Sequence, residues 1–272
     1  MLVKKIIIVS FIGVILFLNI AQSQTTSPTP TTEEIIKTLE KSGALDKAIQ
    51  RGIERYRQNQ IKAAQAKQQM EQLEKAKMAK NARPVDPKND FIYGKPDAMI
   101  SIIEYSDFEC PYCRQFNPVP IEVVDQMPNQ VNLVWRNFPL QFHEPMASKE
   151  AAAAICVAQQ KGNDAFWKFN EGIFKNTLMN GQGLPKSNNI DPLEALAKEQ
   201  GADIEKFKAC INSEAVQKQI NADIEDGRNA GISGTPGVII VNHKSGAFNV
   251  LAGAVPTEVL KQEVTNLLGG KK

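Results

Sequence analysis

Residues 98–113 read AMISIIEYSDFECPYC, and this stretch decides the fold. Ala98 to Tyr105 is an apolar run with the length of a buried strand, and the pair Cys110 and Cys113 follows it closely. A helix is expected to begin at this pair, because Pro111 suits the first turn of a helix, where its missing amide hydrogen is not needed. The stretch therefore predicts an α/β protein in which a cysteine pair follows a strand of the sheet.

The segments on both sides predict a mixed sheet that is interrupted by helices. Further strands are expected at 90–93, 131–137, 237–242 and 247–251, with one helix at about 110–127 and a last helix at 257–268. From about 139 to 230 the sequence is helical throughout, so this block is predicted to be an insertion. Aromatic residues expected in the core are Trp135, Phe166, Trp167, Phe169 and Phe174.

The spacing of the two cysteines suits thiol-disulfide exchange. Free amides and the helix dipole stabilise a thiolate on Cys110, which lowers its pKa and makes it a nucleophile at neutral pH. Cys113 lies one turn further along, where it is more buried and can attack a mixed disulfide held on Cys110. Tyr112 adds bulk and a hydroxyl beside the sulfurs. Because Asp107 and Glu109 bring negative charge, we expect the Cys110 pKa to be less extreme than in the strongest oxidants.

A buried acid and a proline turn support the same chemistry. Glu104 lies within the apolar strand, where its carboxylate could take or relay the proton of Cys113. The alternative for Glu104 is a position on an edge strand facing water. Gly234-Thr235-Pro236-Gly237 is a tight turn before an apolar strand, and a cis peptide bond fits between Thr235 and Pro236. The Thr235 backbone would then be free to pair with an extended client segment.

A C-x-x-C pair is also half of a zinc site. The remaining cysteines, Cys156 and Cys210, are far apart in the sequence, and the chain has only two histidines, His143 and His243. A tetrahedral site would therefore need an unusual assembly. We predict redox chemistry with no cofactor and no metal, and keep a copper- or zinc-binding envelope module as an alternative of another class.

The residues outside this pair have less specific roles. Cys156 and Cys210 lie on separate expected helices and are predicted to form a structural disulfide; two free buried thiols or a secondary redox role are the alternatives. His143 is expected to be a structural or capping residue, and His243 a residue of the hairpin between the last two strands.

The first residues of the chain indicate export. Lys4 and Lys5 precede an apolar run from Ile6 to Ile20, and Ala21-Gln22-Ser23 offers small residues at a cleavage site. Residues 1–23 are therefore predicted to be a cleaved signal peptide. An uncleaved anchor is the alternative, although the run is short for a membrane span. Export places the four cysteines in an oxidising compartment, and we predict the periplasm.

Residues 24–85 are predicted to form a linker and a helical arm. After a Thr/Ser/Pro linker, the stretch 33–83 has 12 basic and 7 acidic residues and no proline, which predicts helix. Its apolar side chains are too few to pack on a globular core, so a second copy of the chain is the nearest partner, through residues 33–80. A solvated basic spacer is the alternative. The net charge of +2 gives no reason to expect nucleic-acid binding.

From about Asp90 to Leu268 the sequence resembles the DsbA-like thioredoxin-fold family of exported disulfide oxidoreductases. The resemblance rests on the run from Glu104 to Cys113, on Asn137-Phe-Pro-Leu140 followed by His143, and on Gly234-Thr235-Pro236. It implies a thioredoxin fold with a helical insertion over residues 86–272. It also implies four roles: attacking sulfur for Cys110, resolving sulfur for Cys113, buried acid for Glu104 and cis-proline for Pro236.

The arm is similar in character to the N-terminal oligomerisation segments of the Com-type and ScsC-like branches of that family. Tyr112 and Thr235 stand where the best-known DsbA members have His and Val, a combination nearer to the DsbG-type isomerases. We therefore predict an oligomeric enzyme that forms or isomerises disulfide bonds in cysteine-containing envelope proteins and is reset by a membrane redox partner. A monomeric DsbA-type dithiol oxidase, re-oxidised by a membrane partner, is the alternative.

Overall fold

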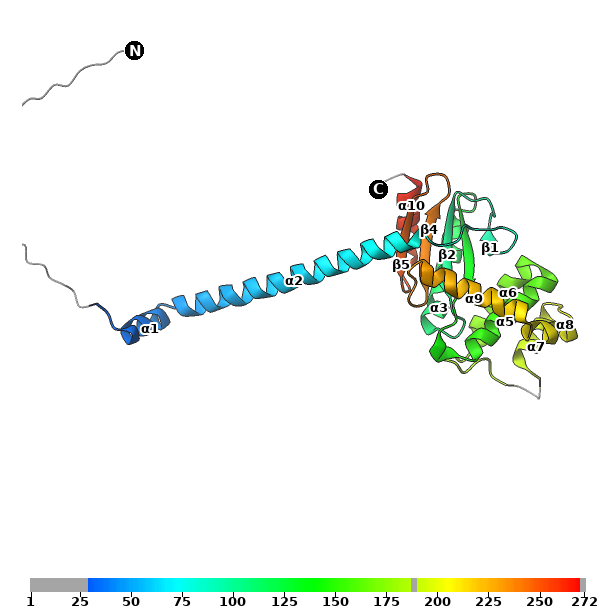
Figure 1. The fold of residues 1–272 in the computed structure, drawn as a ribbon, viewed down its shortest axis with the longest axis horizontal. Helices are drawn as coiled ribbons and strands as arrows, with labels where there is room; N and C mark the ends of the chain where they lie inside the picture. The colour runs from blue at the N-terminus through cyan, green and yellow to red at the C-terminus, as the bar shows by residue number, and fades with distance from the viewer. Residues whose placement is uncertain (1–28, 187–189, 270–272) are drawn as a thin grey trace, which may run out of the picture. The chain divides into compact units, whose positions relative to one another are not determined.

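A computed structural model describes residues 29–186 and 190–269 of the chain (Figure 1). The contacts divide the chain into two compact units, residues 1–63 and 64–272. The expected signal peptide at 1–23 lies outside the described residues, and the expected boundary near residue 85 stays a prediction. No helix in the described ranges is both long enough and apolar enough to span a membrane.

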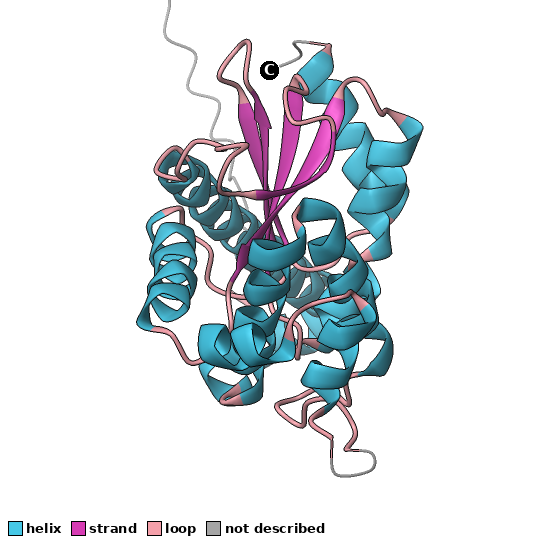
Figure 2. Cartoon of the chain, turned by 90° about the vertical axis from the view of Figure 1, so that its right-hand side faces the viewer, coloured by secondary structure: helices cyan, strands magenta, loops and turns pink. Residues whose placement is uncertain are grey.

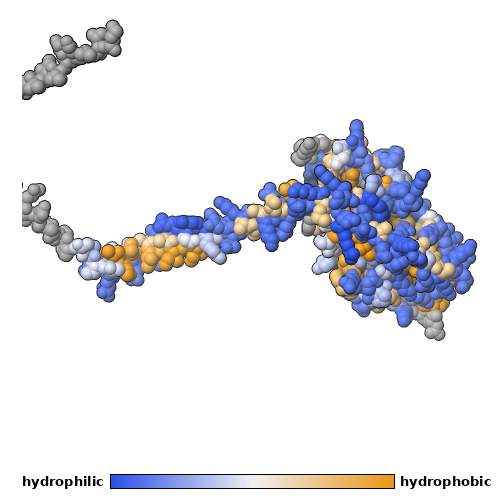
Figure 3. Space-filling view, viewed as in Figure 1, coloured by the Kyte–Doolittle hydropathy of each residue, from blue (hydrophilic) through white to orange (hydrophobic). Residues whose placement is uncertain are grey.

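The first unit contains helix α1 (Thr32–Lys41) and the beginning of helix α2 (Ala44–Ala79). A capping box starts α1, because the Thr31 and Glu34 side chains each accept a hydrogen bond from the other residue's backbone amide. Gly43 adopts a φ of 65° and separates the two helices. The large apolar side chains of this unit are exposed to solvent, and Figure 3 shows an apolar stripe along its helices: Ile35, Ile36, Leu39, Leu45, Ile49, Ile53 and Tyr56.

The second unit is built on a five-stranded mixed sheet with the order β1-β3-β2-β4-β5. Its strands are β1 (Phe91–Gly94), β2 (Ile100–Ser106), β3 (Val131–Asn137), β4 (Gly237–Asn242) and β5 (Phe248–Ala252). β2 and β3 are parallel, and the other neighbouring pairs are antiparallel. The predicted mixed sheet is confirmed. Glu104 is fully buried on the central strand β2, so the alternative of a water-facing glutamate on an edge strand is wrong.

Helices cover both faces of the sheet (Figure 2). The helices of this unit that follow α2 are α3 (Pro111–Phe116), α4 (Pro118–Gln126), α5 (Met146–Lys161), α6 (Asn163–Asn176), α7 (Pro192–Glu199), α8 (Ile204–Ile211), α9 (Glu214–Asn229) and α10 (Thr257–Leu268). Of these, α7 and α8 pack on α5. The single helix expected at 110–127 is in fact two helices. Pro118 has no amide hydrogen to continue the helical hydrogen bonds, so the helix is interrupted there, although Asn117 keeps helical backbone angles.

The expected helical block is also interrupted, by a loop that follows α6. Met179 and Asn180 have φ values of 69° and 55°, and Gly181 and Gly183 also have positive φ values. Four left-handed residues within five positions cannot continue a right-handed helix. The prediction of helix throughout residues 139–230 was therefore wrong for this loop, although the helices on either side of it form.

Alternation along β2 directs its side chains into two cores. Ile100 and Ile102 point into the larger core, which also contains Cys110 and Cys113. The expected core residues all belong to it: Trp135, Phe166, Trp167, Phe169 and Phe174. Ile103 and Tyr105 point to the other face, where Ala79 at the end of α2 packs with them.

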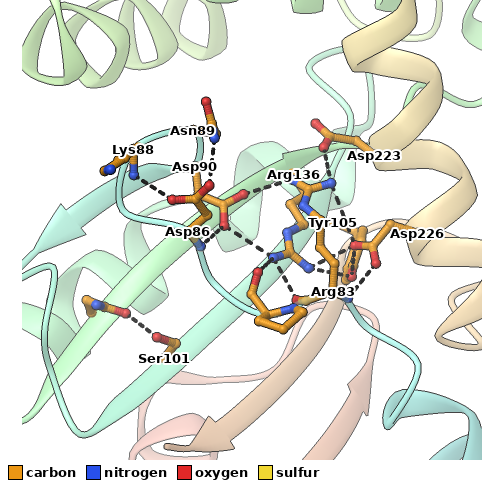
Figure 4. A network of polar contacts seen from close by, with 12 residues as sticks. Arg83, Asp86, Lys88, Asn89, Asp90, Ser101, Tyr105, Arg136, Asp223 and Asp226 are labelled. Atoms are coloured by element: carbon orange, nitrogen blue, oxygen red, sulfur yellow. Dashed lines mark hydrogen bonds and ion pairs between the residues drawn. The ribbon is translucent and has the colours of Figure 1, made fainter.

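An ionic network on this second face joins four segments that are distant in the sequence (Figure 4). The guanidinium of Arg136, on β3, is fully buried and lies 2.8 Å from Asp226 and 3.3 Å from Asp90. Arg83 follows α2 and lies 2.7 Å from both Asp90 and Asp223. The residues 79–90 are therefore fixed to the sheet and to α9 by charge as well as by apolar contact. Nothing in the sequence analysis predicted this network.

Candidate active site

Cys110 is the residue that precedes α3, so its thiol lies at a helix N-terminus. A hydrogen bond from the Cys113 thiol and others from Thr235 and from the amides of Cys113 and Tyr112 outweigh burial and lower the pKa of Cys110 to about 5. That value lies between about 3.5 for a strong oxidant and about 7 for thioredoxin. Cys110 and Cys113 are both free thiols, and the Cys110 residue is 4% exposed.

The turn before β4 faces the Cys110 sulfur. The Thr235-Pro236 peptide bond is cis, and the Cys110 Sγ lies 3.6 Å from the Thr235 carbonyl oxygen. Pro236 is buried, and its carbonyl accepts a hydrogen bond of 3.0 Å from the amide of Gly253. Tyr112 is 63% exposed, on the first turn of α3. The structure therefore brings together the cysteine pair and the proline loop that the sequence places more than 120 residues apart.

Cys113 and Glu104 lie beneath this sulfur, and both are fully buried. Burial raises the pKa of the Cys113 thiol, and the negative charges of Cys110 and Glu104 raise it further. Burial also raises the pKa of Glu104 to about 7. At neutral pH the Glu104 carboxyl can therefore either hold or release a proton, which is what an acid-base partner of Cys113 needs.

A second group of buried polar side chains lies in the loop just before Cys110. Asp107 accepts a hydrogen bond from the amide of Leu140 at 2.9 Å and pairs with Nδ1 of His143 at 2.7 Å. Burial raises the pKa of Asp107, and the contact with His143 opposes that shift. His143 is 3% exposed and fixes this loop, which fits the structural role expected for it.

Glu109 is fully buried beside Glu150, which comes from α5. The Glu109 carboxyl accepts hydrogen bonds from the Thr177 hydroxyl and, at 3.2 Å, from the amide of Gly183. Burial and the nearby Glu109 carboxyl raise the pKa of Glu150 to about 9, so Glu150 is protonated at neutral pH. The loop that follows α6 is thus attached to the residue just before Cys110.

Sequence reasoning missed Glu150. A signal was available, since Glu150 is followed directly by the apolar run AAAAICVA at 151–158, a pattern typical of a helix that is buried on most of its surface. The position of Glu109 opposite it depends on how α5 crosses the loop, which the sequence does not state.

The remaining candidate residues lie elsewhere. Cys156 on α5 and Cys210 on α8 are joined by a disulfide, with 5.8 Å between their Cα atoms. His243 follows β4 and contacts the Ser101 hydroxyl at 2.7 Å. Within the described part of the chain, no three His, Cys, Asp or Glu side chains group together in a way that suits a metal ion.

Comparison with known proteins gives a consistent result for the second unit. A family model described as thioredoxin matches residues 86–250. The crystal structure of DsbA2 from Pseudomonas aeruginosa is similar, with 30% identity and a TM-score of 0.60 over 70% of this chain and 98% of that chain. BdbD from Bacillus subtilis, in its oxidised form, has 22% identity and a TM-score of 0.55 over 68% of this chain and 96% of its own, which shows the fold.

Two further comparisons differ in how much of each protein they cover. A ScsC variant from Proteus mirabilis with a linker deletion has 19% identity and a TM-score of 0.52 over 90% of this chain and 99% of that chain. A Na+/H+ antiporter NhaA 1 from Salinispora arenicola is 29% identical over 192 residues, which are 70% of this chain and 26% of that protein. This chain spans about a quarter of the length of the curated relatives that it matches.

Proposed function

The chain belongs to the DsbA-like thioredoxin-fold family, and from this we propose that it is an exported thiol-disulfide oxidoreductase that forms or isomerises disulfide bonds in cysteine-containing proteins. The observation that carries the proposal is the environment of the Cys110 sulfur. The Cys110 thiol lies at the start of α3 with its pKa lowered to about 5, 3.6 Å from the Thr235 carbonyl and in contact with Cys113.

The oxidising reaction needs only the two sulfurs and a proton donor. A client thiolate attacks Sγ of Cys110 in the oxidised enzyme, the bond to Cys113 breaks, and Cys113 leaves as a thiolate that takes up a proton. A second client thiolate then attacks the client sulfur of the mixed disulfide. The client disulfide forms and Cys110 leaves as a thiolate, which its low pKa favours. Two electrons pass from the client to the cysteine pair.

Isomerisation starts from the reduced pair. The Cys110 thiolate attacks a client disulfide and holds one client sulfur, while the other client sulfur is free to attack elsewhere in the client. If no rearrangement follows, Cys113 attacks Cys110 and releases the client as a thiolate. Disulfide formation and isomerisation take place in oxidising compartments. The Cys156-Cys210 disulfide supports such a location for this chain, and we propose the periplasm.

The proposal can be tested by trapping clients. Cys113→Ala should leave clients bound to Cys110 as mixed disulfides, which a non-reducing gel of an envelope extract detects. The matched variant Cys110→Ala, in which the buried Cys113 remains, should trap none. If the Cys113→Ala variant forms no adducts that reductant releases, proteins are not its substrates. Elemental analysis of the anaerobically reduced protein checks the metal-binding alternative, which predicts stoichiometric copper or zinc.

We also propose that the arm joins copies of the chain. The support is the stripe of seven exposed apolar side chains on α1 and the beginning of α2, because a helix with such a stripe is stable in water when another helix covers it. An oligomer would hold a misbonded client between two active sites, which favours isomerisation. The monomeric oxidase is the competing possibility.

Two substitutions on the stripe distinguish these possibilities. Ile49→Glu with Ile53→Glu should convert the oligomer to a monomer in light scattering and lower the rescue of scrambled ribonuclease several-fold, with simple dithiol oxidation unchanged. Arg51→Glu is the control, because Arg51 lies on the same helix between them and is exposed. If the wild-type protein is already a monomer, the monomeric oxidase is the correct choice.

A further inference from the structure

Ser106 is a buried serine close to Cys113 and Glu104. It lies at the end of β2, two positions after Glu104, so both side chains point to the face of the sheet that carries the cysteine pair. Ser106 is 1% exposed, and Glu104 and Cys113 are fully buried. The three polar groups therefore meet in an interior that bulk water does not reach.

Ser106 lies close to both of the other groups. The Ser106 hydroxyl lies within reach of the Glu104 carboxyl and of the Cys113 thiol, and hydrogen bonding to it lowers the pKa of each. Among the described residues, neither the Glu104 carboxyl oxygens nor the Ser106 hydroxyl has a hydrogen bond of normal distance and angle, to each other or to any further group. Buried polar atoms normally have such partners, because leaving them without one costs about 1 to 3 kcal/mol.

We propose that Ser106 is a catalytic proton-relay residue, whose hydroxyl passes a proton between the Cys113 thiol and the Glu104 carboxyl. The proposal rests on the thiol-disulfide exchange proposed above. A hydroxyl suits this position because it donates one proton and accepts another at the same oxygen. Cys113 cannot exchange its proton with solvent at this depth, and its thiolate is disfavoured there by burial.

The relay balances in both directions. When a client thiolate attacks Cys110, the electron pair of the Cys110-Cys113 bond goes to Cys113. Ser106 donates its proton to the Cys113 sulfur and takes a proton from the neutral Glu104 carboxyl, which becomes a carboxylate. When Cys113 resolves a mixed disulfide, the Glu104 carboxylate takes the proton of Ser106, and Ser106 takes the proton of Cys113. No cofactor is involved, and the only electrons that move are those of the sulfurs.

The chain provides a matched control on the same strand. Ser101 is also a fully buried serine of β2, but its hydroxyl bonds Asn132 at 2.6 Å and His243 at 2.7 Å, near the end of the strand opposite to Ser106. Ser106→Ala and Ser101→Ala therefore remove the same group from the same strand, and only the first lies beside the cysteine pair. Ser106→Thr keeps a hydroxyl and serves as the rescue variant.

The test measures the rate at which dithiothreitol reduces the Cys110-Cys113 disulfide, across pH and in mixtures of H2O and D2O. Ser106→Ala should slow this step on the order of tenfold at pH 7, less than the hundredfold or more typical of losing a general acid. In the wild type, two protons move in this step, so a plot of the rate against the D2O fraction should be curved. In Ser106→Ala only one proton moves, so the plot should be a straight line. Ser101→Ala should match the wild type, and Ser106→Thr should recover most of the rate.

Three results overturn the relay. They are a wild-type rate in Ser106→Ala, an unchanged curve in its D2O dependence, or equal slowing by Ser101→Ala. If the wild-type disulfide does not exchange at all, the proposed function is wrong, and NMR titration of the reduced protein then decides on Ser106. There Ser106→Ala should raise the pKa of both Glu104 and Cys113, and no movement of either pKa overturns the proposal.

Discussion

The Sγ of Cys110 lies 3.6 Å from the carbonyl oxygen of Thr235, the residue joined to Pro236 by a cis bond. The Thr235 hydroxyl also helps to lower the pKa of Cys110, and in the described structure it has no hydrogen bond of normal distance and angle. The loop therefore acts on the sulfur through two different groups, a backbone carbonyl and a side-chain hydroxyl. A substitution at Thr235 removes only the second of them.

Thr235→Val should raise the pKa of Cys110. The variant keeps the size and branching of the side chain and loses one hydrogen bond to a thiolate, worth about 1.5 kcal/mol, so the rise should be about one pKa unit. Absorbance of the thiolate at 240 nm, followed against pH, measures it. Thr235→Ser keeps the hydroxyl and should stay near the wild-type value. An equal pKa in the Val variant would show that the hydroxyl does not act on the sulfur.

Glu150 should make the folded state less stable as pH rises. Its pKa is about 9 in the folded protein and 4.5 in the reference state, so between these values the folded protein binds one more proton than the unfolded chain. Its contribution to the free energy of unfolding therefore decreases by at most about 1.4 kcal/mol per pH unit across this range.

Glu150→Gln should remove that slope, because glutamine stays neutral at every pH. Urea unfolding at pH 5 and at pH 9 measures the effect, and the variant should gain relative to the wild type at the higher pH. Glu171→Gln, at an exposed position of α6, is the control and should leave the slope as it is. Parallel curves for the wild type and Glu150→Gln would mean that Glu150 is ionised in the folded protein.

Asp226→Ala should destabilise the second unit by about 3 to 5 kcal/mol. The substitution removes the carboxylate that lies 2.8 Å from the fully buried Arg136 and accepts the Tyr105 hydroxyl at 2.6 Å. The guanidinium is then left buried with fewer partners, which is the costly way to break such a pair. Glu225→Ala, one position away on the same helix and exposed, should cost less than about 0.5 kcal/mol. Thermal unfolding of both variants compares them.

The Cys156-Cys210 disulfide should resist reduction longer than the Cys110-Cys113 pair does when that pair is oxidised. Cys156 is fully buried, and the bond joins positions 54 residues apart. Dithiothreitol at low concentration, followed by alkylation and mass analysis, should label only Cys110 and Cys113. The double variant Cys156→Ala with Cys210→Ala should lose about 4 kcal/mol of stability, as chain entropy predicts for such a loop. Early labelling of Cys156 would contradict this order.

The elements that could be predicted from the sequence are those whose ends carry their own signals. Three elements match their expected ranges: β3 at 131–137, β4 at 237–242 and α10 at 257–268. Proline or glycine marks at least one end of β4 and of α10. β3 was found from its continuous strand pattern. The helix after Cys110 was predicted as one, because its apolar residues continue through Pro118 and hide the break at Asn117.

The site could be predicted only where it lies in short motifs. The cysteine pair, Glu104 and the Thr235-Pro236 turn each have a local pattern. The Glu109-Glu150 contact and the Arg83, Arg136 and Asp226 network do not, since their members come from elements 40 to 140 residues apart. Such contacts depend on how α5 and α9 pack on the sheet, and no local pattern in one sequence encodes that packing.

Helix α5 carries both Glu150 and Cys156. About a turn and a half separates them, so this helix contacts Glu109, the residue before Cys110, near its beginning and is covalently bonded to α8 further along. The Cys156-Cys210 disulfide therefore restricts the movement of α5 and of Glu150, which lies beside Glu109. If the chain acts as the proposed oxidoreductase, the Cys156-Cys210 bond stays closed while the Cys110-Cys113 bond is exchanged with clients.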